Sequence, residues 1–410
     1  MRFFHLSDLH IGKQLHHYSL LEEQRELLRQ IVAYAKEEQP DAILIAGDIY
    51  DTPVPAADAV AVFDDFLTQL DDLNQELTVC VIAGNHDSPR RLDFASQILA
   101  KHAVYIAGLP PRTEEEYLKR VVLTDTYGEA VIYLLPFVKP AMVRKIFPNE
   151  VLSFSEAVTR LLEREEIDVT KRNILVSHQF YAGGGETPVT SDSEVHVAGG
   201  IDNVDIGVLE PFDYAALGHI HREQKVGDEQ NRYCGTIFPY SVSEAEDAKF
   251  VTLVEMGAKG TEYVYKKLPL HPIRRVRKLT GTMEEVLAMA RECTQDKEPG
   301  INSSAEPMEG SAMVKAEKCH DYVSITLTDE VEAYQPKEQL EEVYDHILEI
   351  RIDNSRTRKL MELGDFETEN LEPYEAFCNF FAEINGREMT EEEDAVLKEV
   401  LQEGGLIEAE

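Results

Sequence analysis

Two histidines lie two positions apart after a short apolar run, in the stretch AALGHIHREQ (215–224). Residues two apart on a strand point to the same side, so we expect His219 and His221 to face a common point. A single histidine at a strand end is more often solvated or packed than chemically active. The pair is a stronger indication of a metal site if other parts of the chain supply partners.

Further predicted strands also end in residue types that bind metals. In open α/β sheets, ligands bind beyond the carboxyl ends of the strands, so these side chains are expected to converge. They are Asp8 and His10 after FFHLS, Asp48 and Asp51 after DAILIAG, Asn85, His86 and Asp87 after TVCVIAG, and His178 after NILVS. Each motif alone is weakly or moderately specific, but all of them in this order predict one metal centre.

The mixture of imidazole, carboxylate and amide groups indicates which metals fit. It suits Mn, Fe, Zn or Ni better than Ca or Mg, which prefer oxygen ligands. Six or seven such groups are too many for one ion and suit two, with an aspartate bridging ions ~3.5–4 Å apart as in two-metal phosphoester hydrolases. Two divalent ions and two aspartates, Asp8 and Asp48, leave a surplus positive charge that a hydroxide and a phosphodiester anion would balance.

The elements that position these residues alternate between strands and helices in the first half of the chain. Apolar residues at helical spacing predict helices over 20–38, 56–73 and 91–102, between the short apolar strands. From about Val121 the strands follow one another more closely, which predicts a second, mixed sheet that includes FVTLVEM and TEYVYKKL. One more helix is expected over 153–165. The fold class is therefore α/β, a two-sheet sandwich flanked by helices.

We expect three regions along the chain. Residues 1–270 form the domain with the predicted metal site, and 271–355 form a small α+β capping domain with a flexible insertion near 293–318. Residues 356–410 form an acidic, helical C-terminal tail. In this tail, Phe377, Phe380 and Phe381 lie at helical spacing, and Thr390 with Glu393 predicts a capping box for a second helix.

Composition limits the possible environments and partners. The chain has 410 residues and five cysteines without a C-x-x-C motif, which predicts reduced thiols and a cytoplasmic protein. We see neither an apolar run of ~20 residues nor a signal peptide. The 40 Lys and Arg against 77 Asp and Glu give a net charge of −37. Such a charge argues against strong DNA binding by this chain alone.

The motifs D-x-H, G-D-x-x-D, G-N-H-D, H and G-H-x-H resemble those of the calcineurin-like metallophosphoesterase superfamily. Within it, HLSDLHIGKQL, AGDIYDTPVP, IAGNHDSPRRL and FDYAALGHIHREQKV are similar to the bacterial SbcD family of nuclease subunits, over roughly Met1 to Lys267. The resemblance assigns Asp8, His10, Asp48 and His221 to one metal, and Asp48, Asn85, His178 and His219 to the other. It makes His86 the group that protonates the leaving oxygen or stabilises transition-state charge, with Asp87 orienting its ring.

The resemblance also implies an activity and partners. It implies two divalent ions, most often Mn²⁺, 3′→5′ exonuclease action on double strands, and endonuclease action on single strands and hairpins. An SbcC-type ATPase would supply much of the DNA-binding surface, in a heterotetramer that contains a dimer of this subunit and acts in DNA repair, recombination and replication. The tail would dock on that partner or, alternatively, pack against its own chain. The alternative function is a metallophosphoesterase acting on small phosphodiesters or phosphoproteins.

Several weaker features keep two interpretations. Asp51 is either a loop carboxylate or a support for the site. His16 and His17 either line the substrate groove or belong to a helix-entry loop. The Gly-rich stretch 181–200 is a functional rim loop or a plain surface loop. Arg90 and Arg91 hold a phosphate or are solvent-exposed, and the basic run 266–278 contacts DNA or protects a strand edge. Cys80 is expected in the core.

Overall fold

The computed structural model describes residues 1–74, 76–148, 150–183, 188–194, 202–295, 318–331, 335–355, 374, 377–378, 381, 387 and 389–403. They divide into two compact units. The first contains Met1–Leu279, Leu287–Ile325 and Lys337–Ile350, and the second contains Thr280–Val286, Thr326–Pro336 and Arg351–Glu410. The predicted metal-binding residues all belong to the first unit.

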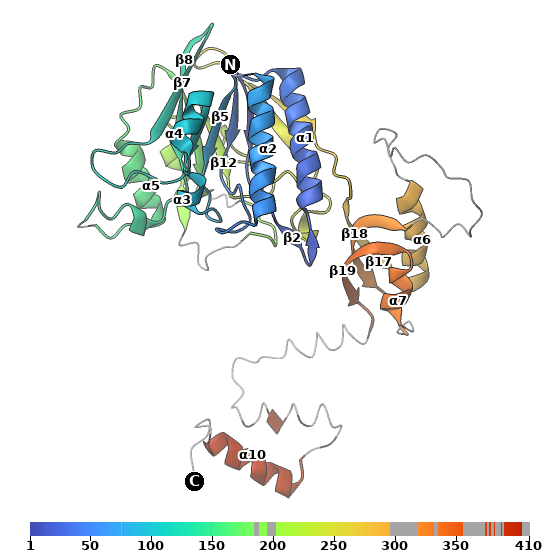
Figure 1. The fold of residues 1–410 in the computed structure, drawn as a ribbon. Coiled ribbons are helices and arrows are strands. Elements are labelled where there is room, and N and C mark those ends of the chain that lie inside the picture. The colour runs from blue at the N-terminus through green and yellow to red at the C-terminus, as the bar shows by residue number, and fades with distance from the viewer. Residues whose placement is uncertain are drawn as a thin grey trace, which may run out of the picture. The chain divides into compact units, whose positions relative to one another are not determined.

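The first sheet carries the first three of the predicted motifs. Its strand order is β16-β15-β1-β4-β5-β6, with β1, β4, β5 and β6 parallel and β15 and β16 antiparallel at one edge. The bounds are β1 Arg2–Leu6, β4 Ala42–Ile45, β5 Thr78–Ile82, β6 Val104–Ala107, β15 Phe250–Glu255 and β16 Val264–Pro269. Helices α1 (Leu21–Glu38) and α2 (Ala57–Leu73) lie side by side against it (Figure 1).

The second sheet carries the remaining two motifs. Its order is β13-β14-β12-β9-β8-β7, and β8, β9, β12 and β14 run parallel. The bounds are β7 Lys119–Asp125, β8 Gly128–Leu135, β9 Arg172–His178, β12 Tyr214–Gly218, β13 Gln224–Val226 and β14 Asp228–Tyr233. Helix α5 (Phe154–Glu163) begins at Ser153, whose hydroxyl and Glu156 form a capping box. The short strands β2 Gln14–Leu15, β3 Tyr18–Ser19, β10 Phe180–Ala182 and β11 Asn203–Asp205 form two small ribbons.

Three apolar clusters hold these layers together. One cluster lies between the two sheets and contains Leu44 and Cys80 from the first sheet with Ile174 and Val176 from the second. A second cluster joins the first sheet to α1 and α2, and a third joins the second sheet to α5. Because both faces of the central strands are covered, the sequences of these strands are continuous apolar runs. The predicted two-sheet sandwich is confirmed, as is the core position of Cys80.

Two predictions about these elements were wrong. The strands β15 and β16 belong to the first sheet, where β15 pairs with β1, and not to the second. The apolar pattern shows that a strand is buried but does not indicate which strand pairs with it. The helix expected over 91–102 is divided into α3 (Pro89–Leu92), α4 (Ser96–Leu99) and a 3₁₀ turn (Ala100–His102), because Ala95 has a left-handed φ of 61°.

The small domain has the expected α+β character. A sheet of order β17-β18-β19 contains β17 Val276–Gly281, β18 Cys319–Leu327 and β19 Tyr344–Ile352, with helices α6 Met283–Gln295 and α7 Pro336–Glu341. The sequence pattern did not predict β19. The insertion expected near 293–318 lies outside the described residues except at its ends, where Cys293 to Gln295 belong to α6.

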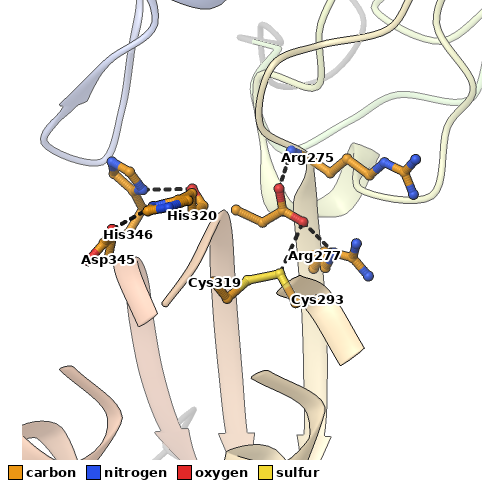
Figure 2. The surroundings of a disulfide bond; sticks show 8 residues. Arg275, Arg277, Cys293, Cys319, His320, Asp345 and His346 are labelled. Atoms are coloured by element: carbon orange, nitrogen blue, oxygen red, sulfur yellow. Dashed lines mark hydrogen bonds and ion pairs between the residues drawn. A yellow bond between two sulfur atoms is a disulfide. The ribbon is translucent and has the colours of Figure 1, made fainter. Parts of the chain in front are cut away.

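A disulfide bond joins Cys293 and Cys319, whose Cα atoms are 5.6 Å apart (Figure 2). The expectation that all cysteines are reduced thiols is therefore wrong for this pair. Sequence spacing could not show it, because the two residues are 26 positions apart and meet only when α6 packs beside β18. Cys80, Cys234 and Cys378 are free.

In the tail, helix α10 spans Glu391–Glu403. Its capping box is confirmed: the Thr390 amide donates to Glu393 Oε2 at 2.8 Å, and the Glu393 amide lies 3.4 Å from the Thr390 hydroxyl. The aromatic helix expected before it falls largely outside the described residues. Among the helices that the structure describes, none combines the length and the apolar character that crossing a bilayer requires.

Candidate metal centre

The structure brings the strand-end residues of both sheets together. His178 is the last residue of β9, and the others follow β1, β4, β5 and β12 directly. The proposed ligands are buried or half-buried. Four of them have a left-handed backbone, namely Asp8, His10, Asp48 and His219. Such strain in side-chain-bearing residues is concentrated at functional sites.

Glycines keep the space in which these loops approach one another. A Cβ atom on Gly84 would lie 2.1 Å from Asp48 Oδ1, and one on Gly218 would lie 2.0 Å from the carbonyl oxygen of Ala46. Both distances are far below a van der Waals contact. Side chains at these two positions would push the strand ends apart, which explains the glycines in the GNHD and GHIH motifs.

One group of side chains contains Asp8, His10 and His221. The Nε2 atoms of His10 and His221 lie 3.2 Å apart. Two nitrogens each bound at ~2.1 Å to one ion would be separated by about 3 Å, so the spacing fits a shared cation. His10 Nε2 also lies 3.7 Å from Asp48 Oδ2.

The second group lies around Asp48 and Asn85. His178 Nε2 is 3.3 Å from Asp48 Oδ2 and 3.0 Å from Asn85 Oδ1, and His219 Nδ1 is 2.9 Å from the same Asn85 oxygen. The Nδ1–H of His178 donates to the carbonyl of Ala46 at 2.7 Å, because a carbonyl can only accept. That contact leaves Nε2 as the His178 nitrogen that faces the group, where a bound cation would replace its proton.

Asp48 lies between the two groups, which fits a bridging carboxylate. Burial opposes its charge, yet the neighbouring histidines outweigh burial and hold the pKa of Asp48 well below its usual range. The same pairing acts on His178: burial lowers its pKa, but the Asp48 carboxylate dominates and raises it to about 9. The backbone amide of His86 fixes the other Asp48 oxygen, Oδ1, at 2.8 Å. The donor set, its burial and its spacing fit two divalent ions.

His86 lies at the edge of this centre, with its ring 4.9 Å from the ring of His10 and perpendicular to it. Its Nδ1–H donates to the backbone carbonyl of Asp51 at 3.0 Å, so Nε2 is the nitrogen free to act on a substrate. The expectation that Asp87 orients this ring was wrong. Asp87 instead accepts from the amides of Ile49, Tyr50 and Gly84 at 2.9–3.1 Å, and so ties the loop after β4 to the loop after β5.

Asp51 supports the site from two directions. Besides its carbonyl contact with His86, its carboxylate accepts from Lys13 Nζ at 2.8 Å and lies 3.4 Å from His10 Nδ1. Burial would raise the pKa of Asp51, but His10 and Lys13 outweigh burial and lower it to about 2. The structure therefore favours the supporting role over that of a plain loop carboxylate.

Several polar residues that hold the metal-site loops were not predicted from the sequence. Gln24 on α1 donates to the carbonyls of Leu9 and His10 at 3.2 and 2.7 Å. Glu194 accepts from the amide of His221 at 2.6 Å, and burial together with the Asp8 and Glu244 charges raises its pKa to about 7. The only sequence signal for Gln24 is its position on the apolar face of α1, where a polar residue is unusual. Glu194 falls within the stretch 181–200, for which a functional rim loop is one of the two interpretations.

The structure places the weaker candidates at exposed positions or in ion pairs. His16 and His17 are exposed at the turn of the β2–β3 ribbon, just before α1, and Arg90 and Arg91 are exposed on α3. Much of the basic run 266–278 is ion-paired: Lys266 with Glu38, Lys267 with Glu223, Arg274 with Glu22 and Glu23, and Arg277 with Asp321. These pairs greatly reduce the positive charge that the run offers to DNA.

Comparisons with known proteins agree with this geometry. The sequence profile of the calcineurin-like phosphoesterase family matches residues 1–223, and that of the type 5 capsule protein repressor C-terminal domain matches residues 269–385. The SbcD subunit of the nuclease SbcCD from Staphylococcus saprophyticus is 27% identical over 407 residues, covering 98% of each chain. Together these matches confirm the resemblance to SbcD-type proteins.

Two solved structures are more distant. The anchor protein GAP50 of the Plasmodium inner membrane complex is 13% identical with a TM-score of 0.39, covering 66% of this chain and 89% of its own. A dimetal phosphatase from Danio rerio is 14% identical with a TM-score of 0.35, covering 66% of this chain and 96% of its own.

Proposed function

Because this chain belongs to the calcineurin-like phosphoesterase family, we propose that it is the two-metal nuclease subunit of an SbcCD-type complex. The observation that carries the proposal is the convergence of seven ligand-type side chains from two sheets on one buried centre, in a chain similar to an SbcD nuclease subunit over almost its whole length.

The proposed ligands divide between two ions. Asp8, His10 and His221 would hold one ion, Asn85, His178 and His219 would hold the other, and Asp48 would bridge them. Ions held there would act as Lewis acids on the phosphodiester and make water a better nucleophile near neutral pH. Among the divalent ions available in a cell, the imidazole-rich ligand set favours Mn²⁺ over Mg²⁺ and Ca²⁺.

The chain's own residues would supply positioning and the proton. Asp51 holds the His86 ring through its carbonyl, which leaves Nε2 as the nitrogen that would donate a proton to the leaving oxygen, from the doubly protonated form of the ring. Asp87 contributes through the backbone, because three amides of the metal-site loops bind its carboxylate. An error of ~1 Å in such loops can reduce a rate ~10²-fold, so both roles matter for hydrolysis.

DNA is the proposed substrate, and an SbcC-type ATPase is the proposed partner. The support is the full-length similarity to an SbcD nuclease subunit together with the charge of −37 and the ion-paired basic run. A chain with so few available cations needs another protein to neutralise DNA phosphates. The complex would act as a 3′→5′ exonuclease on double strands and an endonuclease on single strands and hairpins, in cytoplasmic DNA repair, recombination and replication.

The proposed organisation follows from this assembly. Residues 1–270 would be the nuclease domain and 271–355 the capping domain, within a heterotetramer containing a dimer of this subunit. The tail, 356–410, would dock on the ATPase. Helix α10 exposes Val396 and Val400, each by 59%, and Phe377 is half exposed, so apolar surface remains for a partner to cover.

The test is degradation of an end-labelled linear duplex with Mn²⁺, with and without the ATPase subunit and ATP. We expect slow cleavage of single strands by this chain alone and strong, ATP-dependent duplex degradation with the partner. The variant Asp48→Ala in the same complex is the matched control. Hydrolysis of small phosphodiesters without cleavage of either DNA form would instead favour a small-molecule or phosphoprotein phosphoesterase.

A further inference from the structure

His221 has a polar partner on the side of its ring that faces away from the metal centre. Its Nε2 atom faces His10, whereas its Nδ1 atom lies 2.7 Å from the hydroxyl oxygen of Ser193. The same hydroxyl oxygen lies 2.7 Å from Oε1 of Glu244, which is fully buried. The direct distance from His221 Nδ1 to Glu244 Oε1 is 3.6 Å, too long for a hydrogen bond, so the serine bridges the two.

Glu244 is held as an acceptor by a buried cation. Lys249, whose side chain is 7% exposed, donates to Glu244 Oε2 at 2.8 Å, and the Thr236 hydroxyl lies 3.1 Å from the same oxygen. A carboxylate that balances a buried ammonium group stays ionised, because neither charge has water to replace its partner. Oε1 therefore accepts a hydrogen bond and has no proton to give.

This arrangement determines where the protons lie. Ser193 has one hydroxyl proton, which it donates to the Glu244 carboxylate. Toward His221 the serine oxygen can then only accept, so Nδ1 of His221 must carry the ring proton. The neutral ring consequently directs its Nε2 lone pair at His10 and the metal centre. In His178 a backbone carbonyl accepts the Nδ1 proton in the same way, whereas in His221 a serine hydroxyl does so.

The segment 188–194, which carries Ser193, is anchored for this role. Val189 exchanges hydrogen bonds with the side chain of Gln224, at 2.9 and 2.7 Å, and the amide of Asp192 donates to Ser243 at 3.1 Å. Glu194, the next residue, accepts from the His221 amide. Two adjacent side chains of one segment therefore hold the ring and the backbone of the same histidine.

We propose that Ser193, with Glu244 and Lys249 behind it, is a positioning residue that fixes the tautomer and orientation of His221 for metal binding. The inference rests on the metal centre of the proposed function and adds a role for part of the Gly-rich stretch. Partners of this kind typically change metal affinity ~10–100-fold when removed. Ser193 is assigned no contact with DNA or with the reacting atoms.

The test compares Mn²⁺ titrations of the wild type, Ser193→Ala, Ser193→Thr and Ser241→Ala. Ser241 is the matched control, because its hydroxyl lies 3.1 Å from the same Glu244 oxygen but is bonded to Ser243 rather than to His221. We expect one of the two Mn²⁺ sites to weaken ~10–100-fold in Ser193→Ala, and to keep its affinity in Ser193→Thr and Ser241→Ala. A ¹⁵N imidazole spectrum should show the Nδ1–H tautomer of His221 in the wild type and lose it in Ser193→Ala.

The possible failures are distinguishable. A wild-type chain that binds no Mn²⁺ would contradict the proposed function itself. A wild type that binds two ions, with Ser193→Ala titrating like Ser241→Ala, would overturn only the role of Ser193. Equal weakening in Ser193→Ala and Ser193→Thr would also overturn it, because the hydroxyl would then not be the group that matters. An Nε2–H tautomer of His221 in the metal-free wild type would contradict the proton assignment.

Discussion

Replacing His86 by asparagine separates its two possible contributions to hydrolysis. The backbone amide that holds Asp48 Oδ1 at 2.8 Å remains in any variant, and the asparagine side-chain NH₂ can still donate to the Asp51 carbonyl. What is lost is the ring nitrogen Nε2. The variant should therefore keep both metal ions and lose only the group proposed to protonate the leaving oxygen.

The expected magnitude follows from that single loss. A positioned proton donor contributes ~10²–10⁴ in rate. At ~1.4 kcal/mol per tenfold change, this corresponds to about 3–6 kcal/mol of transition-state stabilisation. The loss should depend on the substrate. A DNA strand leaves as a basic alkoxide that needs a proton, whereas nitrophenolate is stable without one.

The assay measures single-turnover cleavage of a single-stranded oligonucleotide and of bis-p-nitrophenyl phosphate, with saturating Mn²⁺. We expect His86→Asn to slow oligonucleotide cleavage by ~10²–10⁴ and the nitrophenyl ester by less than ~10-fold. An equal loss on both substrates would refute the proton-donor role and favour stabilisation of charge on the phosphoryl group. Loss of bound metal would show that His86 acts as a ligand.

Four other outcomes follow from the structure. Asp48→Ala should lose bound metal together with activity, and two ions retained per chain by elemental analysis would contradict the bridging role. Under denaturing conditions without reductant, three of the five thiols should react with a thiol reagent, because Cys293 and Cys319 are linked; five reactive thiols would refute the link. Burial lowers the pKa of His5 to about 3, so below pH ~6.5 the unfolded state binds a proton at this ring and the folded state does not. The free energy of unfolding therefore decreases as the pH falls from ~6.5 toward 3. That loss is at most about 5 kcal/mol in chemical denaturation, and an equal pH dependence in His5→Gln would exclude His5 as its origin. Duplex affinity and its salt dependence should both rise sharply when the ATPase is added, whereas tight binding by this chain alone at physiological salt would contradict the need for a partner.

The convergence of the proposed metal ligands could be predicted from the sequence because its signals are local. Each motif follows a strand that its own apolar run identifies, and parallel strands bring their carboxyl ends to one edge. Without any knowledge of strand order, that reasoning predicted that Asp8, Asp48 and His178 lie close together, as they do in the structure. The same locality explains the helices α1, α2 and α5, whose apolar periodicity and, for α5, capping box are contained in the segment itself.

What the sequence did not show depends on contacts between distant residues. The pairing of β15 with β1 joins residues about 250 positions apart in the chain, and the apolar pattern of β15 would suit either sheet. The true partners of Asp87 are backbone amides, which no residue type reveals. Ser193 and Glu244 are 51 positions apart, and neither stands out by type or spacing before the fold brings both to His221.

The central claim is that these side chains hold two metal ions close enough to act on one phosphodiester. Electron paramagnetic resonance of the Mn²⁺-loaded chain measures this most directly. We predict the spectrum of a spin-coupled Mn²⁺ pair, saturating at two ions per chain and absent in Asp48→Ala. A spectrum of isolated Mn²⁺ ions, or saturation at one ion per chain, would contradict the two-metal centre.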